Sequence, residues 1–188
     1  MPEVNFLERA LRDISALLYS HQIAYMVIGG LANAKWGNPR ATLDIDLTIW
    51  APDHNIQHIV SFLEKSYTIL VEKPMAFISE TRVLPIKARE GQRIDLIFGA
   101  LPFERDAIER AVKVQIGQTS VKFCTAEDLI LLKIISHRPK DAEDVQGIVK
   151  FQKEQLDYNY LEPRIRELAE LLEQPEIKQN WEKWKNNF

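Results

Sequence analysis

The chain has 188 residues, of which 46% are hydrophobic and 27% charged, and its formal net charge is −3. This length and composition are typical of one globular domain, or of one domain with a small appendage. The slightly acidic balance argues against broad nonspecific binding to nucleic acid, although a local basic patch is compatible with it. The single cysteine, Cys124, excludes an internal disulfide bond and favours a reducing compartment.

The sequence contains no apolar run that approaches the length of a transmembrane helix. The first residues include acids and lack the apolar core of a signal peptide. We therefore expect a cytoplasmic protein without a membrane partner, whose oligomeric state is open.

Hydrophobic periodicity predicts a mixture of helices and strands in the first two thirds of the chain. In chain order, the first predicted elements are a helix over residues 5–20, a strand over 24–28, a short helix over 31–36, a strand over 43–50 and a helix over 52–65. They are followed by strands over 68–72, 76–78, 83–89 and 93–98, a helix over 102–111, and a hairpin of strands over 112–116 and 120–123.

From Thr125 onward the pattern predicts helices alone. They cover residues 125–137, a segment that begins at Pro139, and residues 158–172 and 176–186. The fold class we predict is α/β (α+β), with a mixed β-sheet flanked by helices and a helical C-terminal part. We expect a core domain over residues 1–124, on which residues 125–188 pack.

Two carboxylates alternate with large apolar residues in the predicted strand over residues 43–50. Because side chains alternate between the faces of a strand, Asp44 and Asp46 share one face, opposite Leu43, Ile45 and Leu47. Adjacent carboxylates repel each other, and a divalent metal ion between them relieves that repulsion. The alternative is an edge strand with a hydrated face, but the apolar flanks favour a central strand and a metal site.

A third carboxylate, Asp95, lies in the predicted strand over residues 93–98 and needs a partner if it is buried. One candidate partner is Arg93, on the same face of that strand. The other is a metal ion shared with Asp44 and Asp46. Two Mg²⁺ ions bridged by three aspartates are an arrangement for phosphoryl transfer, because one ion activates the attacking oxygen and the other neutralises the triphosphate.

Gly29 and Gly30 form the predicted turn between a strand and a short helix. Glycine lets the backbone approach a ligand closely, and the N-terminus of the following helix offers free N–H groups to a phosphate. A tight connection without a ligand is the simpler interpretation of the same two residues.

Lys133 lies in a predicted helix that is apolar almost all round, so we expect it to be buried. A buried lysine needs an acidic partner from the core or, in a functional site, a nucleotide phosphate. Asp141 and Asp144 follow the proline that begins the next helix, where acids are common for reasons of helix stability alone. Helix stability does not explain Arg138, which precedes that proline.

These features occur in the order of a known family. Its motifs match Gly29-Gly30, Arg40-x-Thr42-x-Asp44-x-Asp46, Asp95, Lys133 and Arg138-x-Lys140-Asp141-x-x-Asp144. Over residues 25–149 the chain resembles the nucleotidyltransferase superfamily of the DNA polymerase beta type. It is most similar to the AbiEii-type branch, found as toxins of bacterial toxin–antitoxin and phage-defence systems. Many members have Gly-Ser where this chain has Gly-Gly, so backbone donors would replace a hydroxyl contact to phosphate.

The resemblance implies roles for these residues. It implies that Asp44, Asp46 and Asp95 bind Mg²⁺ or Mn²⁺ and that Lys133 joins them as a catalytic residue. The implied nucleotide-binding residues are Gly29, Gly30, Arg40, Thr42, Lys133, Arg138, Asp141 and Asp144.

We therefore expect a metal-dependent nucleotidyltransferase, in which an acceptor hydroxyl attacks the α-phosphate of an NTP and pyrophosphate leaves. The resemblance favours RNA, especially tRNA, as the acceptor, while a protein or a small molecule stays open. It also implies a cognate antitoxin as a partner. The main alternative is a non-catalytic module of the same fold that holds a nucleotide or a partner. A metal-dependent phosphohydrolase is less favoured, because the chain lacks a set of several His and Asp ligands.

Overall fold

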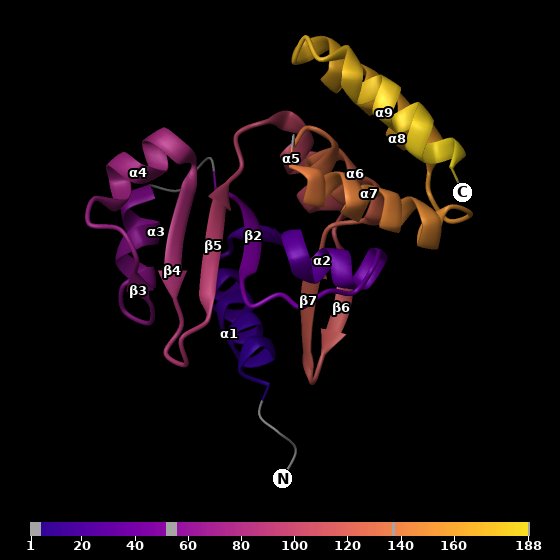
Figure 1. Cartoon of the computed structure of the whole chain (residues 1–188). Helices are drawn as coiled ribbons and strands as arrows, with labels where there is room; N and C mark the ends of the chain where they lie inside the picture. The colour runs from indigo at the N-terminus through magenta and orange to yellow at the C-terminus, as the bar shows by residue number, and fades with distance from the viewer. Residues whose placement is uncertain (1–4, 52–55, 137, 188) are drawn as a thin grey trace. The chain divides into compact units, whose positions relative to one another are not determined.

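The strands of the structure belong to one mixed sheet. This computed structural model describes residues 5–51, 56–136 and 138–187. The strands are β1 (Ala24–Val27), β2 (Ile45–Trp50), β3 (Thr68–Ile69), β4 (Val83–Lys87), β5 (Arg93–Phe98), β6 (Val112–Ile116) and β7 (Thr119–Phe123). Within the described ranges they form a seven-stranded sheet in the order β3-β4-β5-β2-β1-β7-β6 (Figure 1).

Strand β2 lies inside this sheet and not at its edge. It pairs in parallel with β5 and antiparallel with β1, while β1 pairs in parallel with β7. Ile45, Leu47 and Ile49 alternate along β2 and are fully buried, as expected for the apolar face of a central strand. The predicted central position of the carboxylate-bearing strand is therefore confirmed.

Helices pack on this sheet. They are α1 (Phe6–Ser20), α3 (Ile56–Leu63), α4 (Pro74–Thr81) and α5 (Pro102–Arg110). The Asn5 side chain caps α1 by accepting hydrogen bonds from the N–H groups of Leu7 and Glu8. Helix α1 contacts β1 and β7, and α5 contacts β1 and β2. Helix α4 contacts both α3 and β4 (Figure 1).

The structure differs from the sequence predictions in this part of the chain, most clearly at residues 76–78, 68–72 and 43–44. The strand predicted over residues 76–78 is wrong, because these residues belong to helix α4. Pro74 occupies the first turn of that helix, where its fixed φ is favourable, and the left-handed Arg82 (φ 60°) ends it. The predicted strand over residues 68–72 is reduced to Thr68–Ile69. Strand β2 begins at Ile45, two residues later than predicted.

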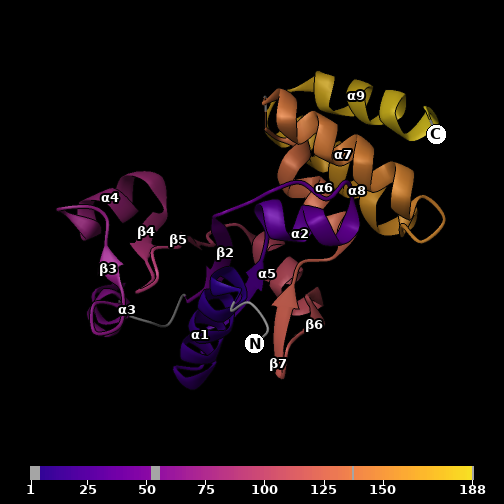
Figure 2. The same ribbon diagram turned by 60° about the horizontal axis from the view of Figure 1, so that its bottom comes forward.

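A group of helices follows β7. They are α6 (Ala126–Ile134), α7 (Pro139–Gln152), α8 (Tyr158–Leu171) and α9 (Pro175–Asn186). Thr125 caps α6, since its hydroxyl oxygen accepts from the N–H of Asp128. Helices α8 and α9 run side by side, and α6 packs on α7 and α8 (Figure 2). The predicted fold class, a mixed sheet with helices and a helical C-terminal part, is thus confirmed. The expected helix start at residues 52–55 and the expected helix end at residue 137 lie outside the described residues.

The chain forms two compact units. Unit 1 comprises Met1–Leu31 and Ala41–Cys124, and unit 2 comprises Ala32–Arg40 and Thr125–Phe188. Helix α2 (Gly29–Trp36) begins in unit 1 and ends in unit 2. The expected division into a core over residues 1–124 and a helical part over residues 125–188 that packs on it stays a prediction. None of the described helices is both long enough and apolar enough to cross a membrane.

Candidate active site

Two of the three predicted metal ligands lie next to each other on the sheet of unit 1. Asp46 in β2 pairs in register with Asp95 in the parallel strand β5. Residues opposite each other on neighbouring strands point to the same face of a sheet, and the strands lie about 4.8 Å apart. Asp44 directly precedes β2 and is exposed. We call Asp44, Asp46 and Asp95 the carboxylate set.

Arg93 is a cation that bonds directly to the carboxylate set. Its Nε donates to both carboxylate oxygens of Asp95, at 3.0 and 3.2 Å. This hydrogen bond is the largest cause of a raised pKa of Arg93, and the negative charges of Asp95, Asp44 and Asp46 add to it. The guanidinium is thus the counter-charge of all three aspartates, as the simpler interpretation of Asp95 requires.

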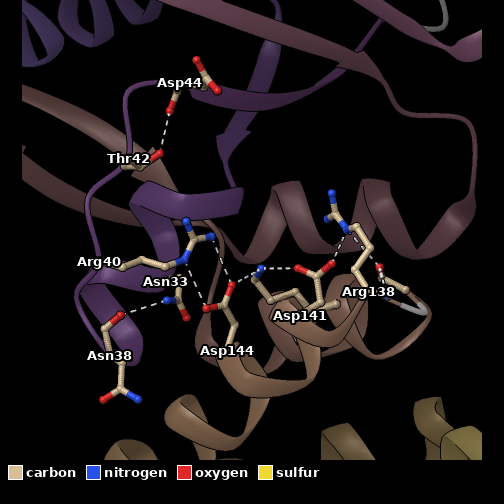
Figure 3. Close-up of polar contacts among 10 residues, drawn as sticks. Asn33, Asn38, Arg40, Thr42, Asp44, Arg138, Asp141 and Asp144 are labelled. Atoms are coloured by element: carbon tan, nitrogen blue, oxygen red, sulfur yellow. Dashed lines mark hydrogen bonds and ion pairs between the residues drawn. The ribbon is translucent and has the colours of Figure 1, made fainter.

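The Gly-Gly turn fits closely around two of the predicted site residues. Gly29 has φ +64°, and a Cβ atom built on it would overlap the carboxylate of Asp46. A Cβ on Gly30 would lie 2.6 Å from the hydroxyl oxygen of Thr42. A side chain at either position would therefore collide with a neighbour, the Asp46 carboxylate at Gly29 and the Thr42 side chain at Gly30. Thr42 in turn donates its hydroxyl to the carbonyl oxygen of Asp44 at 3.3 Å (Figure 3).

The chemistry of the carboxylate set fits a hard divalent cation, because Mg²⁺ and Mn²⁺ prefer oxygen ligands. The close approach of Gly29 also puts the Asp46 carboxylate beside the start of helix α2, where the first N–H groups have no partner within the helix. Among the described residues, however, no three carboxylate, histidine or cysteine side chains converge closely enough to hold a metal ion. Asp46 and Asp95 are neighbours in the sheet, but Asp95 is paired with Arg93.

The second group of predicted site residues forms a charged network in unit 2. The ammonium of Lys133 donates to Asp141 and to Asp144, each at 2.7 Å. Arg40 donates from Nε and Nη2 to the two oxygens of Asp144, both at 3.3 Å, and Arg138 donates to Asp141 at 2.6 Å (Figure 3). We call these five residues the helical charge cluster. It contains three cations and two anions, so its net charge is positive.

Burial separates the members of this cluster. Lys133 is 6% exposed, which confirms its predicted burial, and its partners Asp141 and Asp144 are buried as well. The side chain of Arg138 is 77% exposed, and that of Arg40 is 29% exposed. Arg138 and Arg40 can therefore meet a ligand from solution, whereas the Lys133 ammonium is enclosed between two acids.

The charges within the cluster also change the acidity of its carboxylates. Burial raises the pKa of Asp141, but hydrogen bonds from Lys133, Ser136 and Arg138, with the charge of Lys133, outweigh this effect. The pKa of Asp141 is therefore lower than that of an ordinary aspartate, and the carboxylate is ionised at neutral pH.

Two features of the site were missed from the sequence. Leu43, expected on the apolar face of the strand, precedes β2 and is 81% exposed. Together with the half-exposed Phe6, it lines a pocket of about 610 Å³ whose other walls include Asp44 and Arg93. Asn33 is fully buried in α2 and donates to the carbonyl oxygen of Asn38 at 3.0 Å, which fixes the loop before Arg40. Neither residue has a local sequence signal that separates it from ordinary surface or helix positions.

The fold of this chain is similar to that of solved nucleotidyltransferase structures. An antigenic nucleotidyltransferase-like protein from Paracoccidioides brasiliensis is 16% identical, with a TM-score of 0.57 over 94% of this chain and 92% of that one. The lincosamide antibiotic adenylyltransferase LnuA, lincomycin-bound, is 17% identical, with a TM-score of 0.53 over 77% of this chain and 97% of that one. The antibiotic-resistance factor ANT(2'')-Ia is 15% identical, with a TM-score of 0.58 over 88% of this chain and 94% of that one.

The family model for nucleotidyltransferases of unknown function (DUF6036) matches residues 6–188. The chain therefore belongs to this nucleotidyltransferase family. Comparison with the curated proteins gives no match. The predicted superfamily is thus confirmed, while membership of the AbiEii-type branch stays a prediction.

Proposed function

We propose that this protein transfers a nucleotidyl group from an NTP to an acceptor hydroxyl, with release of pyrophosphate. The observation that carries the proposal is that Asp46 lies opposite Asp95 in the strand register. Gly29 lies beside Asp46, at a position with no room for a side chain. The register puts the two carboxylates side by side, and Asp46 lies beside the start of helix α2. The first N–H groups of a helix have no partner within it and are suited to bind phosphate. The membership of the nucleotidyltransferase family supports the same reaction.

The carboxylate set, Asp44, Asp46 and Asp95, would hold Mg²⁺ or Mn²⁺. When bound, such an ion supplies charge neutralisation for the triphosphate and lowers the pKa of the attacking hydroxyl. Gly29 and Gly30 let the triphosphate approach the backbone, and Thr42 fixes the segment that carries Asp44. These residues hold and orient the phosphates in this proposal.

The helical charge cluster has a related role in the proposal. Arg40 and Arg138, the partly exposed cations, are the residues that can contact nucleotide phosphates. Lys133 holds Asp141 and Asp144 in place through its two short hydrogen bonds. We therefore assign Lys133 to positioning these acids, although its predicted catalytic role stays a prediction.

The acceptor is defined only as a hydroxyl compound. The pocket beside Asp44 offers room for it, and its exposed Leu43 and Phe6 favour an acceptor with an apolar face. Two proteins of similar fold are named for antibiotics, lincosamide adenylyltransferase and ANT(2'')-Ia, which supports testing small molecules besides RNA, tRNA and proteins. A toxin role with a cognate antitoxin stays a prediction. Growth arrest on expression that disappears in the Asp46→Asn variant would support a toxin role.

The test uses NTPs labelled at the α-phosphate, with Mg²⁺ and separate pools of RNA, protein and small hydroxyl compounds. We expect transfer of the label to one pool and release of pyrophosphate. Asp46→Asn should lower the rate by about 100-fold, because it removes a charged oxygen that the reaction needs. Asp106→Asn is the matched control, since Asp106 pairs with its neighbour Arg105 on the surface. Absence of transfer to every pool, together with absence of NTP and Mg²⁺ binding in calorimetry, would contradict the proposal.

The second candidate function is a non-catalytic module that holds a nucleotide or a partner. The observation that favours it is the ion pair of Asp95 with Arg93, which satisfies one carboxylate without any ligand. Mg²⁺-dependent binding of an NTP without turnover in the presence of all three acceptor pools would favour this module over the transferase.

A further inference from the structure

The carboxylate set contains three negative charges within a few residues of two neighbouring strands. Asp46 and Asp95 are opposite each other in the register of β2 and β5, and Asp44 precedes β2. Carboxylates so close together repel each other unless a positive charge lies between them. The structure supplies such a charge from the protein itself, in the guanidinium of Arg93.

Arg93 forms hydrogen bonds directly with the carboxylate of Asp95. The Nε atom is shared between both oxygens of this carboxylate, at 3.0 and 3.2 Å. The side chain of Arg93 is 50% exposed and that of Asp95 is 22% exposed, so this pair is partly open to water. An exposed pair of this kind is weak, and a ligand can separate it at small cost.

The guanidinium also has space to move. Arg93 lines the pocket of about 610 Å³ that it shares with Asp44, Phe6 and Leu43. In the sheet, Arg93 lies opposite Lys87 of β4, an exposed cation for which no carboxylate partner occurs among the described side chains. The two cations therefore share one face of the sheet, but only Arg93 bonds to the carboxylate set.

We propose that Arg93 is the resident counter-ion of the carboxylate set, and that Asp95 can bind a divalent cation only when the guanidinium releases it. This inference rests on the proposed function, because it assumes that the carboxylate set binds a divalent cation. It explains why three aspartates in a nucleotidyltransferase fold do not converge on a common point in the described chain. It also makes Arg93 a positioning residue that sets the affinity of the site for metal.

The test compares Mn²⁺ binding to the full chain and to its Arg93→Gln variant, by the electron paramagnetic resonance of free Mn²⁺. Loss of the competing guanidinium should tighten Mn²⁺ binding by about fivefold, the range expected for a partly exposed ion pair. Lys87→Gln is the matched control, because it removes a charge from the same sheet face without freeing a carboxylate. Its effect should stay below about twofold, since exposed charges are screened by salt.

Thermal unfolding gives a second measurement that needs no enzymatic activity. In EDTA, Arg93→Gln should lower the melting temperature, because the three carboxylates lose their counter-charge. Saturating Mn²⁺ should raise the melting temperature of Arg93→Gln more than that of the unchanged chain. A purely structural role of Arg93 would lower both values equally and would leave Mn²⁺ affinity unchanged.

The outcomes separate this inference from the proposed function. Equal or weaker Mn²⁺ binding by Arg93→Gln, with clear binding by the unchanged chain, overturns the role of Arg93 and leaves the transferase proposal standing. Absence of Mn²⁺ binding by both proteins overturns the inference and the metal-dependent transferase together. Tighter binding without any label transfer supports the counter-ion role and contradicts the transferase reaction alone.

Discussion

At the scale of single residues, the site depends on Gly29 having no side chain. Gly29 adopts φ +64°, and the space where its Cβ would lie is filled by the carboxylate of Asp46. Glycine is therefore needed twice at this position, once for its backbone conformation and once for its size. The same residue begins helix α2, so a change here alters the carboxylate and the helix start together.

We predict that Gly29→Ala lowers the free energy of unfolding by about 3 kcal/mol, because left-handed strain of about 1 kcal/mol adds to the displacement of Asp46. Gly117→Ala is the control, since Gly117 has a similar φ of +60° and its added Cβ would meet only the mobile end of Arg12, at 3.3 Å. We expect a loss of about 1 kcal/mol there. Urea titration measures both values, and equal losses would contradict the predicted clash.

At the scale of elements, helices α6 and α7 are held together by ion pairs as well as by apolar contacts. Lys133 of α6 donates to Asp141 and Asp144 of α7, and all three side chains are buried. Two buried carboxylates share one ammonium here. Removing either partner would leave an uncompensated buried charge, which costs free energy of folding. The stability of the packing between these helices should therefore depend on pH.

The sign of this dependence follows from the lowered pKa of Asp141. A carboxylate whose pKa is lower in the folded state stabilises the fold above its unfolded pKa of about 4, and this contribution is lost as pH falls through the folded value. We predict that Asp141→Asn costs about 2 kcal/mol at pH 7, typical of a charged hydrogen bond, and that the difference shrinks below about pH 4. Urea unfolding at several pH values measures it, with Asp106→Asn as the control. A difference that is constant from pH 7 to pH 3 would contradict the assignment.

At the scale of the whole molecule, the chain passes from unit 1 to unit 2 inside helix α2 and returns after Arg40. The end of α2 belongs to unit 2 by its bonds: Gln152 donates to the carbonyl oxygen of Trp36 at 3.0 Å, and Arg40 pairs with Asp144. The short segment Ala32–Arg40 should therefore lose its structure together with α6 and α7.

Hydrogen exchange on the full chain tests this division. Asp141→Asn should speed exchange by about 30-fold, the equivalent of about 2 kcal/mol, in α6, α7 and the end of α2, while β2 and β5 keep their protection. Gly117→Ala, in unit 1, should leave the end of α2 unchanged. Equal loss of protection in β2 would show that the chain unfolds as one unit, and it would contradict separate unfolding of the two units.

Much of this fold follows from local patterns. Short apolar runs predicted β1 and β5, period-two alternation predicted β2, and helical periodicity predicted α1, because the pattern of burial follows the geometry of each element. The segment of α4 was predicted wrongly as a strand, since a short apolar stretch fits both structures and only the proline in its first turn favours a helix. Leu43 was misplaced for a related reason, because alternation cannot show where a strand begins.

The sequence alone determined the order of the charged residues and the glycine pair, and with them the class of fold. These features are local: the motif order is written along the chain, and glycine is the residue that best accepts the positive φ at residue 29. The tertiary structure decided which charges meet. Strand pairing sets Asp46 opposite Asp95, and folding brings Arg40 to Asp144 across 104 residues. Such pairs depend on distances through space, which the spacing along the chain does not fix. The need for glycine at residue 29 is therefore partly local, through its positive φ, and partly tertiary, through the carboxylate of Asp46.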